Sequence, residues 1–185
     1  GKVSIIFAWM IFFNVILAYG METAFFRFYN NEKDKENVIE TTTVSIFWSS
    51  FIFLFTAMLF RNSLADWSDI DSQFVIYTIW ILALDALVIV PFSKLRAHQR
   101  PMVYAIIKIG NVVINLSLSV FFLLYLPKIA GSYPEGYLSS LYVENFQVGY
   151  IFVANIIASL LTFVVLSPNY IYLKWKFDFT LWKRM

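Results

Sequence analysis

Long apolar runs separated by short polar segments dominate the pattern of residues along this chain. Five runs stand out, and they cover residues 3–21, 41–60, 74–92, 102–126 and 148–166. At about 1.5 Å of rise per residue, each is long enough to cross a hydrocarbon core of about 30 Å. The second and fifth carry no charge, whereas a soluble core helix would show a polar stripe at helical period. The pattern predicts an all-α polytopic membrane protein, with five transmembrane helices in one transmembrane domain over residues 1–185.

The composition favours the same fold class. Hydrophobic residues make up 60% of the 185 residues and charged residues only 14%, about half the charged fraction of an ordinary soluble domain. Aromatic residues reach 20%, an excess typical of side chains that face lipid or lie at the headgroup boundary. The net charge of +2 is too small to indicate nucleic-acid binding. We therefore expect membrane lipid as a partner and no nucleic acid.

Lysine and arginine are distributed unevenly among the polar connections. If residues 27–40, 93–101 and 174–185 share one side of the membrane, that side holds ten basic residues. These are Arg27, Lys33, Lys35, Lys94, Arg96, Arg100, Lys174, Lys176, Lys183 and Arg184. The opposite side holds only Lys2, Arg61 and Lys128. The basic side is expected to be cytoplasmic, so the chain should begin outside and end inside. The tail over residues 174–185 mixes Trp and Phe with Lys and Arg, which predicts an amphipathic interfacial segment or the start of another span.

One charged residue lies near the middle of the third apolar run. Asp85 costs about 3 kcal/mol at the centre of a span, but the run also contains 12 Leu, Ile, Phe or Val residues that contribute roughly −0.3 to −0.6 kcal/mol each. The sum of these free-energy contributions still favours insertion of the third run into the membrane. Asp85 is therefore expected inside the membrane.

A second intramembrane charge, Lys108, lies in the fourth run. The turn between the two runs centres near residue 97, about twelve residues from Asp85 and eleven from Lys108. In an antiparallel hairpin the two side chains reach nearly the same depth, and either charge alone would be costly there. We predict an intramembrane ion pair between Asp85 and Lys108. A purely structural role for this pair is as compatible with the sequence as a functional one.

Other polar residues recur at helical spacing within the spans. Such stripes must face other helices or a wet cavity, although Asn and Ser also join helices by simple hydrogen bonds. The stripes are Lys108, Asn111, Asn115 and Ser119 on the fourth span, Asn14, Ala18 and Glu22 on the first with Arg27 just beyond, and Asn155 and Ser159 on the fifth. No catalytic cluster, nucleotide fingerprint or metal-ligand spacing accompanies them. The sequence predicts neither an enzyme nor a bound cofactor or metal.

Four segments resemble one family of membrane proteins. They are YGMETAFFRFYNNE at residues 19–32, LALDALVIVPFSKLRAHQR at 82–100, VGYIFVANIIASLL at 148–161 and WKFDFTLWKRM at 175–185. These segments are similar to polysaccharide biosynthesis membrane proteins of the Wzx-type oligosaccharide flippase family. That family belongs to the superfamily of lipid II flippases and MATE drug exporters. The similarity covers essentially the whole chain, in order and with matching loop lengths.

The resemblance implies a specific architecture and activity. Such proteins have two six-helix lobes around a central cavity, and this chain would supply the second to sixth helices of the first lobe. We therefore expect a fragment, with the first helix and the second lobe of the same protein as partners. Family members move a polyprenyl-diphosphate oligosaccharide across the bacterial cytoplasmic (inner) membrane for cell-surface polysaccharides such as lipopolysaccharide in the cell envelope.

By the same resemblance, the first span here lines the cavity. The residues expected to bind substrate are Asn14, Glu22, Arg27, Lys108, Asn111 and Asn115. Arg27 and Lys108 would attract the anionic diphosphate, and the asparagines would bind sugar hydroxyls. Two alternatives stay open. One is a MATE-type exporter that uses Asp85 or Glu22 as its ion site, and the other is a membrane scaffold of a glycan assembly complex.

The charge distribution makes a testable prediction about topology. Reagents that cannot cross the membrane should label the turn over residues 93–101 only when they have access to the cytoplasmic side. The measurement compares intact cells with inside-out vesicles. Labelling of this turn from outside intact cells would contradict the predicted orientation.

Overall fold

The computed structural model of the chain describes residues 2–132, 136 and 139–185. These residues form helices and turns and contain no strand. Five helices among them are long and apolar enough to cross a membrane. They cover Ala8–Asn31, Lys35–Leu59, Ser72–Ala97, Pro101–Ser132 and Gln147–Leu166. The chain is therefore an all-α, multi-pass membrane protein, which confirms the predicted fold class.

Several of these spans are built from two or more helical segments. The first contains α1 (Lys2–Ala18) and α2 (Met21–Asn31), the second is α3 (Lys35–Leu59), and the third contains α5 (Ser72–Leu87) and α6 (Ile89–Ala97). The fourth joins α7 (Pro101–Val120), the π-helical segment η1 (Phe121–Tyr125) and α8 (Leu126–Ser132), and the fifth is α9 (Gln147–Leu166). Shorter elements are α4 (Arg61–Ser68), the 3₁₀ turn η2 (Ser139–Leu141), α10 (Pro168–Ile171) and α11 (Phe179–Arg184).

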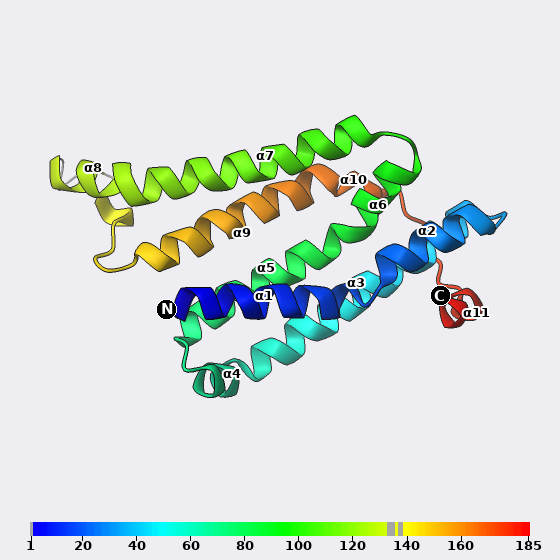
Figure 1. The fold of residues 1–185 in the computed structure, drawn as a ribbon, viewed down its shortest axis with the longest axis horizontal. Coiled ribbons are helices and arrows are strands. Elements are labelled where there is room, and N and C mark those ends of the chain that lie inside the picture. The colour runs from blue at the N-terminus through cyan, green and yellow to red at the C-terminus, as the bar shows by residue number, and fades with distance from the viewer. Residues whose placement is uncertain (1, 133–135, 137–138) are drawn as a thin grey trace.

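Helix α5 lies at the centre of the bundle. It packs against α1 and α3 on one side and against α9 on the other, while α7 packs along α9. Figure 1 shows α7 and α9 running together, with α1 and α3 on the opposite side of α5. The three basic segments, around α2, the end of α6 and α11, lie at one end of the molecule, and α4 and α8 lie at the other (Figure 1). The count of lysine and arginine in the polar connections assumed that these three segments share one side of the membrane, and the structure places them at one end.

The helices extend further than the apolar runs predicted. Residues 27–40 were expected to form a polar connection, but α2 ends at Asn31 and α3 begins at Lys35. Asp34 caps α3, because its carboxylate accepts the Asn37 backbone N–H at 3.1 Å. Pro127 likewise does not end the fourth span, since it follows η1, where Leu126 N–H already bonds Phe121 C=O five residues back. Hydropathy marks the hydrocarbon boundary, whereas caps and turns decide where a helix ends.

The third span bends between α5 and α6, and a proline explains the bend. Pro91 has no N–H, so the carbonyl of Leu87 loses its helical donor. The Tyr170 hydroxyl donates a hydrogen bond to that carbonyl instead. Burial raises the pKa of the Tyr170 phenol above its ordinary value, and the phenol is protonated at neutral pH even without this rise. Helix α10 therefore stabilises the bend in a span far away in sequence.

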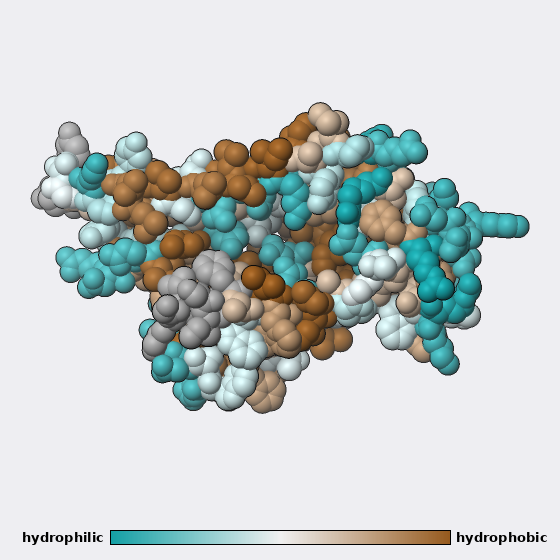
Figure 2. Space-filling view, viewed as in Figure 1, coloured by the Kyte–Doolittle hydropathy of each residue, from teal (hydrophilic) through white to brown (hydrophobic). Residues whose placement is uncertain are grey.

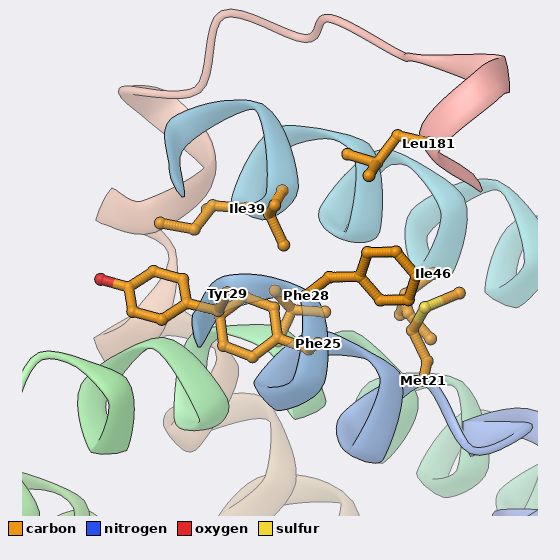
Figure 3. Packing of buried hydrophobic residues seen from close by; sticks show 9 residues of the cluster. Met21, Phe25, Phe28, Tyr29, Ile39, Ile46 and Leu181 are labelled. Atoms are coloured by element: carbon orange, nitrogen blue, oxygen red, sulfur yellow. The ribbon is translucent and has the colours of Figure 1, made fainter. Parts of the chain in front are cut away.

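The C-terminal tail docks against the second and first spans. Leu181 of α11 lies in a buried cluster with Phe25, Phe28 and Ile46 (Figure 3). A polar contact also holds α11 in position, because the Trp182 indole N–H donates to the Ser45 hydroxyl at 2.8 Å. The predicted interfacial segment over residues 174–185 is thus helical only over α11. It is held by specific contacts to protein as well as by its amphipathic composition.

Asp178 begins this docked helix. Its carboxylate accepts the Leu181 backbone N–H at 2.9 Å and the Asn37 side-chain amide at 3.0 Å. The Leu181 bond first, and then the Asn37 bond, hold the pKa of the Asp178 carboxyl below its ordinary value. A lowered carboxyl pKa contributes stability above the ordinary carboxyl range, and that contribution is lost as the pH falls through the lowered pKa.

Replacing Asp178 by Ala should release the tail, because α11 loses its cap and its link to α3. We expect residues 179–185 to lose hydrogen-exchange protection several-fold at neutral pH. Acidifying the wild-type protein below about pH 4 should do the same, after correction for intrinsic exchange rates. Asp178→Asn is the matched control, since Asn keeps an acceptor that does not titrate. An Ala variant with wild-type protection would contradict this account of docking.

Candidate functional site: a polar cavity among the spans

Polar side chains from four of the five spans converge on one cavity of about 230 Å³. Its polar lining residues are Asn14, Glu22, Asp85, Arg96, Tyr104, Lys108, Asn111, Asn155, Ser159 and Thr162. Figure 2 shows hydrophilic side chains gathered in the hollow between α7 and α1. Polar groups at this depth would be costly in contact with lipid. The cavity is therefore a polar compartment inside an otherwise apolar bundle.

Two helix breaks carry residues into this cavity. Gly20 has φ +70°, a conformation that suits glycine because it lacks a Cβ. This break separates α1, which carries Asn14, from α2, which carries Glu22. The bend after Leu87 similarly separates Asp85 on α5 from Arg96 on α6. Each of these spans therefore presents two polar residues to the cavity, one from each side of its break.

An ion pair crosses the end of the cavity nearest the basic turns. The Arg96 guanidinium donates to the Glu22 carboxylate, which joins α6 to α2. The same guanidinium lies over the rings of Phe26 and Tyr104, at 4.9 and 5.1 Å from their centroids. Arg96 Nε is buried and makes no hydrogen bond. The cation is thus held by one carboxylate and two rings, with part of its donor capacity unused.

Asp85 and Lys108 both line the cavity, and each has a different nearest partner. The Asp85 carboxylate accepts the Ser159 hydroxyl at 3.0 Å. The Lys108 ammonium lies 4.9 Å from the centroid of the Phe92 ring. Among the described residues no ion pair within 4.0 Å joins Asp85 to Lys108. Both residues line the same cavity, and the predicted ion pair between them stays a prediction. Equal depth places two groups at one level, but rotation about each helix axis decides whether they meet.

Two asparagines of α7, Asn111 and Asn115, lie in different surroundings. Asn111 lines the cavity and donates to the Thr162 hydroxyl at 2.9 Å, which ties α7 to α9. Asn115, one turn further along α7, does not line the cavity and accepts the Ser119 hydroxyl at 3.5 Å. The stripe on α7 therefore turns away from the cavity after Asn111.

The structure brings together four of the six predicted binding residues. Those four are Asn14, Glu22, Lys108 and Asn111. Arg27 instead lines a separate pocket beside α11. Sequence reasoning missed Arg96, which had been counted only as part of a basic turn. Arg96 follows Asp85 by eleven residues, which is three helical turns, so helical spacing places both residues on one face of the third span. That spacing was the signal by which the sequence could have indicated Arg96.

The lining offers charged and hydrogen-bonding groups for electrostatic recognition. It holds two carboxylates, Glu22 and Asp85, and two cations, Arg96 and Lys108. Amides and hydroxyls surround them. In the described part of the chain no group of three or more His, Cys, Asp or Glu residues is placed to hold a metal ion. Comparison with known proteins found no matching family model, curated protein or solved structure.

The cavity should be wet while the outer face of α7 lies in lipid. The chain has no native cysteine, so single cysteines report on their own positions. A cysteine at Asn111 should react with a hydrophilic maleimide, because a thiol ionises in water and not in hydrocarbon. A cysteine at the adjacent Val112, an exposed apolar position (54%), is the control at equal depth and should not react. Equal labelling of both positions would show that the cavity is not a separate aqueous compartment.

Proposed function

We propose that this chain forms a substrate-binding part of a transporter that moves a lipid-linked oligosaccharide across the bacterial cytoplasmic membrane. The observation that carries the proposal is the polar cavity among membrane-spanning helices, with two cations and several hydrogen-bonding amides on its walls. A sugar needs many hydrogen-bond partners, and a diphosphate needs cations. The resemblance to Wzx-type flippases points to the same class of substrate.

The cations of the cavity are assigned to the diphosphate. Arg96 has unused donors and lies at the end of the cavity next to the basic turns. Lys108 has no carboxylate within 4.0 Å and is free to bind an anion. The amides of Asn14, Asn111 and Asn155 are assigned to sugar hydroxyls. In this proposal Glu22 holds Arg96 until the diphosphate replaces it.

A second function, ion-coupled export of organic cations, draws support from the two carboxylates. Glu22 and Asp85 lie in the same cavity as the cations. A carboxylate in such a site can bind a proton or Na⁺ and attract a cationic substrate. In this second function the acidic residues of the cavity, rather than the basic ones, bind the transported ion or substrate.

Export of surface glycan by the complete protein distinguishes these functions. We expect Arg96→Gln and Lys108→Gln each to lower the export rate about tenfold or more, because a hydrogen bond to a charged group contributes roughly 1.5–3 kcal/mol. Lys94→Gln is the matched control, since Lys94 lies on α6 but does not line the cavity. Expression level is measured alongside.

Variants of the two acidic residues should affect glycan export much less than variants of the two basic residues. Glu22→Gln and Asp85→Asn should leave glycan export within a few-fold of wild type if the cations bind the substrate. Loss of ion-dependent efflux in the acidic variants, with the basic variants active, would favour the exporter. Wild-type glycan export and wild-type ion-dependent efflux in all four variants would contradict both transport proposals and favour a scaffold.

A further inference from the structure

Arg27 lies in a second polar pocket, outside the cavity described above. The pocket has a volume of about 280 Å³ and lies between α2 and the C-terminal helix α11. It is lined by Arg27, Phe28, Asn31, Glu32 and Arg184. The two arginines are far apart in sequence and meet only because the tail docks on α2 and α3. This pocket is a product of tertiary structure.

Two guanidinium groups lie over one aromatic ring in this pocket. Arg27 lies 5.9 Å and Arg184 5.7 Å from the centroid of the Phe28 ring. Arg184 also pairs with the Glu32 carboxylate at 2.9 Å. In the described part of the chain no ion pair includes Arg27. The pocket therefore has one carboxylate for two cations and keeps an uncompensated positive charge.

The pocket lies where the spans leave the hydrocarbon. Arg27 and Asn31 are at the polar end of the first span, and α11, which carries Trp182, lies at the same end of the molecule as α2 (Figure 1). Tryptophan is enriched at the level of lipid headgroups. A basic pocket between helices at this depth suits the phosphate of an anionic lipid, which guanidinium groups bind through paired hydrogen bonds.

We propose that the Arg27–Arg184 pocket binds the phosphate headgroup of an anionic membrane phospholipid. The lipid phosphate lies between the two guanidinium groups, the Asn31 side chain supplies a further hydrogen-bond donor, and the lipid tails extend beside α2 into the bilayer. Such a lipid also ties α11 to α2, because its phosphate contacts one arginine from each helix. The site is distinct from the polar cavity and does not depend on what the cavity transports.

The test is retention of phosphatidylglycerol by the purified protein, measured by native mass spectrometry against phosphatidylcholine. We expect the wild-type protein to prefer phosphatidylglycerol. Arg27→Ala and Arg184→Ala should each lower that preference about fivefold, the contribution of one basic residue near an anionic surface. Lys33→Ala is the matched control, because it removes the same charge at the same end of the molecule without lining the pocket. An equal loss in the control would overturn the proposal in favour of general surface attraction.

Arg184→Ala also removes the ion pair with Glu32, so a second variant separates lipid binding from tail docking. Glu32→Gln removes the carboxylate that competes for Arg184, and we expect phosphatidylglycerol retention to rise. Unchanged or lower retention in this variant would contradict the proposal. Inorganic phosphate in large excess distinguishes the source of the phosphate: a lipid site keeps its lipid, whereas complete displacement would show a site for free phosphate and overturn the lipid assignment.

Discussion

The structure depends on one constraint: polar groups among the membrane-spanning helices must find partners within the protein, because the hydrocarbon supplies none. The bend at Pro91 illustrates it. Proline removes a donor from the third span, and the Tyr170 hydroxyl replaces it at the Leu87 carbonyl. The same requirement explains why Asp85 receives the Ser159 hydroxyl and why Asn111 binds Thr162. Each pairing joins two different helices, so satisfying polar groups also sets the packing of the helices.

The polar cavity follows from this requirement. The polar groups of four spans avoid lipid by facing a common space, and the two acids there balance the two bases in formal charge. Balance does not mean that every group is paired, since Lys108 rests on the Phe92 ring rather than on a carboxylate. A compartment with balanced but incompletely paired charges can exchange partners with a charged ligand at lower cost than a fully paired one.

The basic end of the molecule is organised by different forces. There the helices leave the hydrocarbon, and the tail combines apolar burial of Leu181 with the cap at Asp178 and a surface ion pair from Arg184. Exposed ion pairs alone contribute little. The buried leucine and the cap therefore determine the position of α11, and the position of α11 brings Arg184 to Arg27.

The sequence by itself determined the fold class, the five spans and the common side of the basic segments, because hydropathy and charge are properties of local segments. It also indicated most of the cavity-lining residues, since helical spacing places polar residues on one face. Only the tertiary structure decided that Glu22 meets Arg96, that Asp85 accepts the Ser159 hydroxyl, and that Arg27 lies outside the cavity. Those outcomes depend on helix rotation, on two backbone breaks and on the docked tail, which bring together residues far apart in the chain.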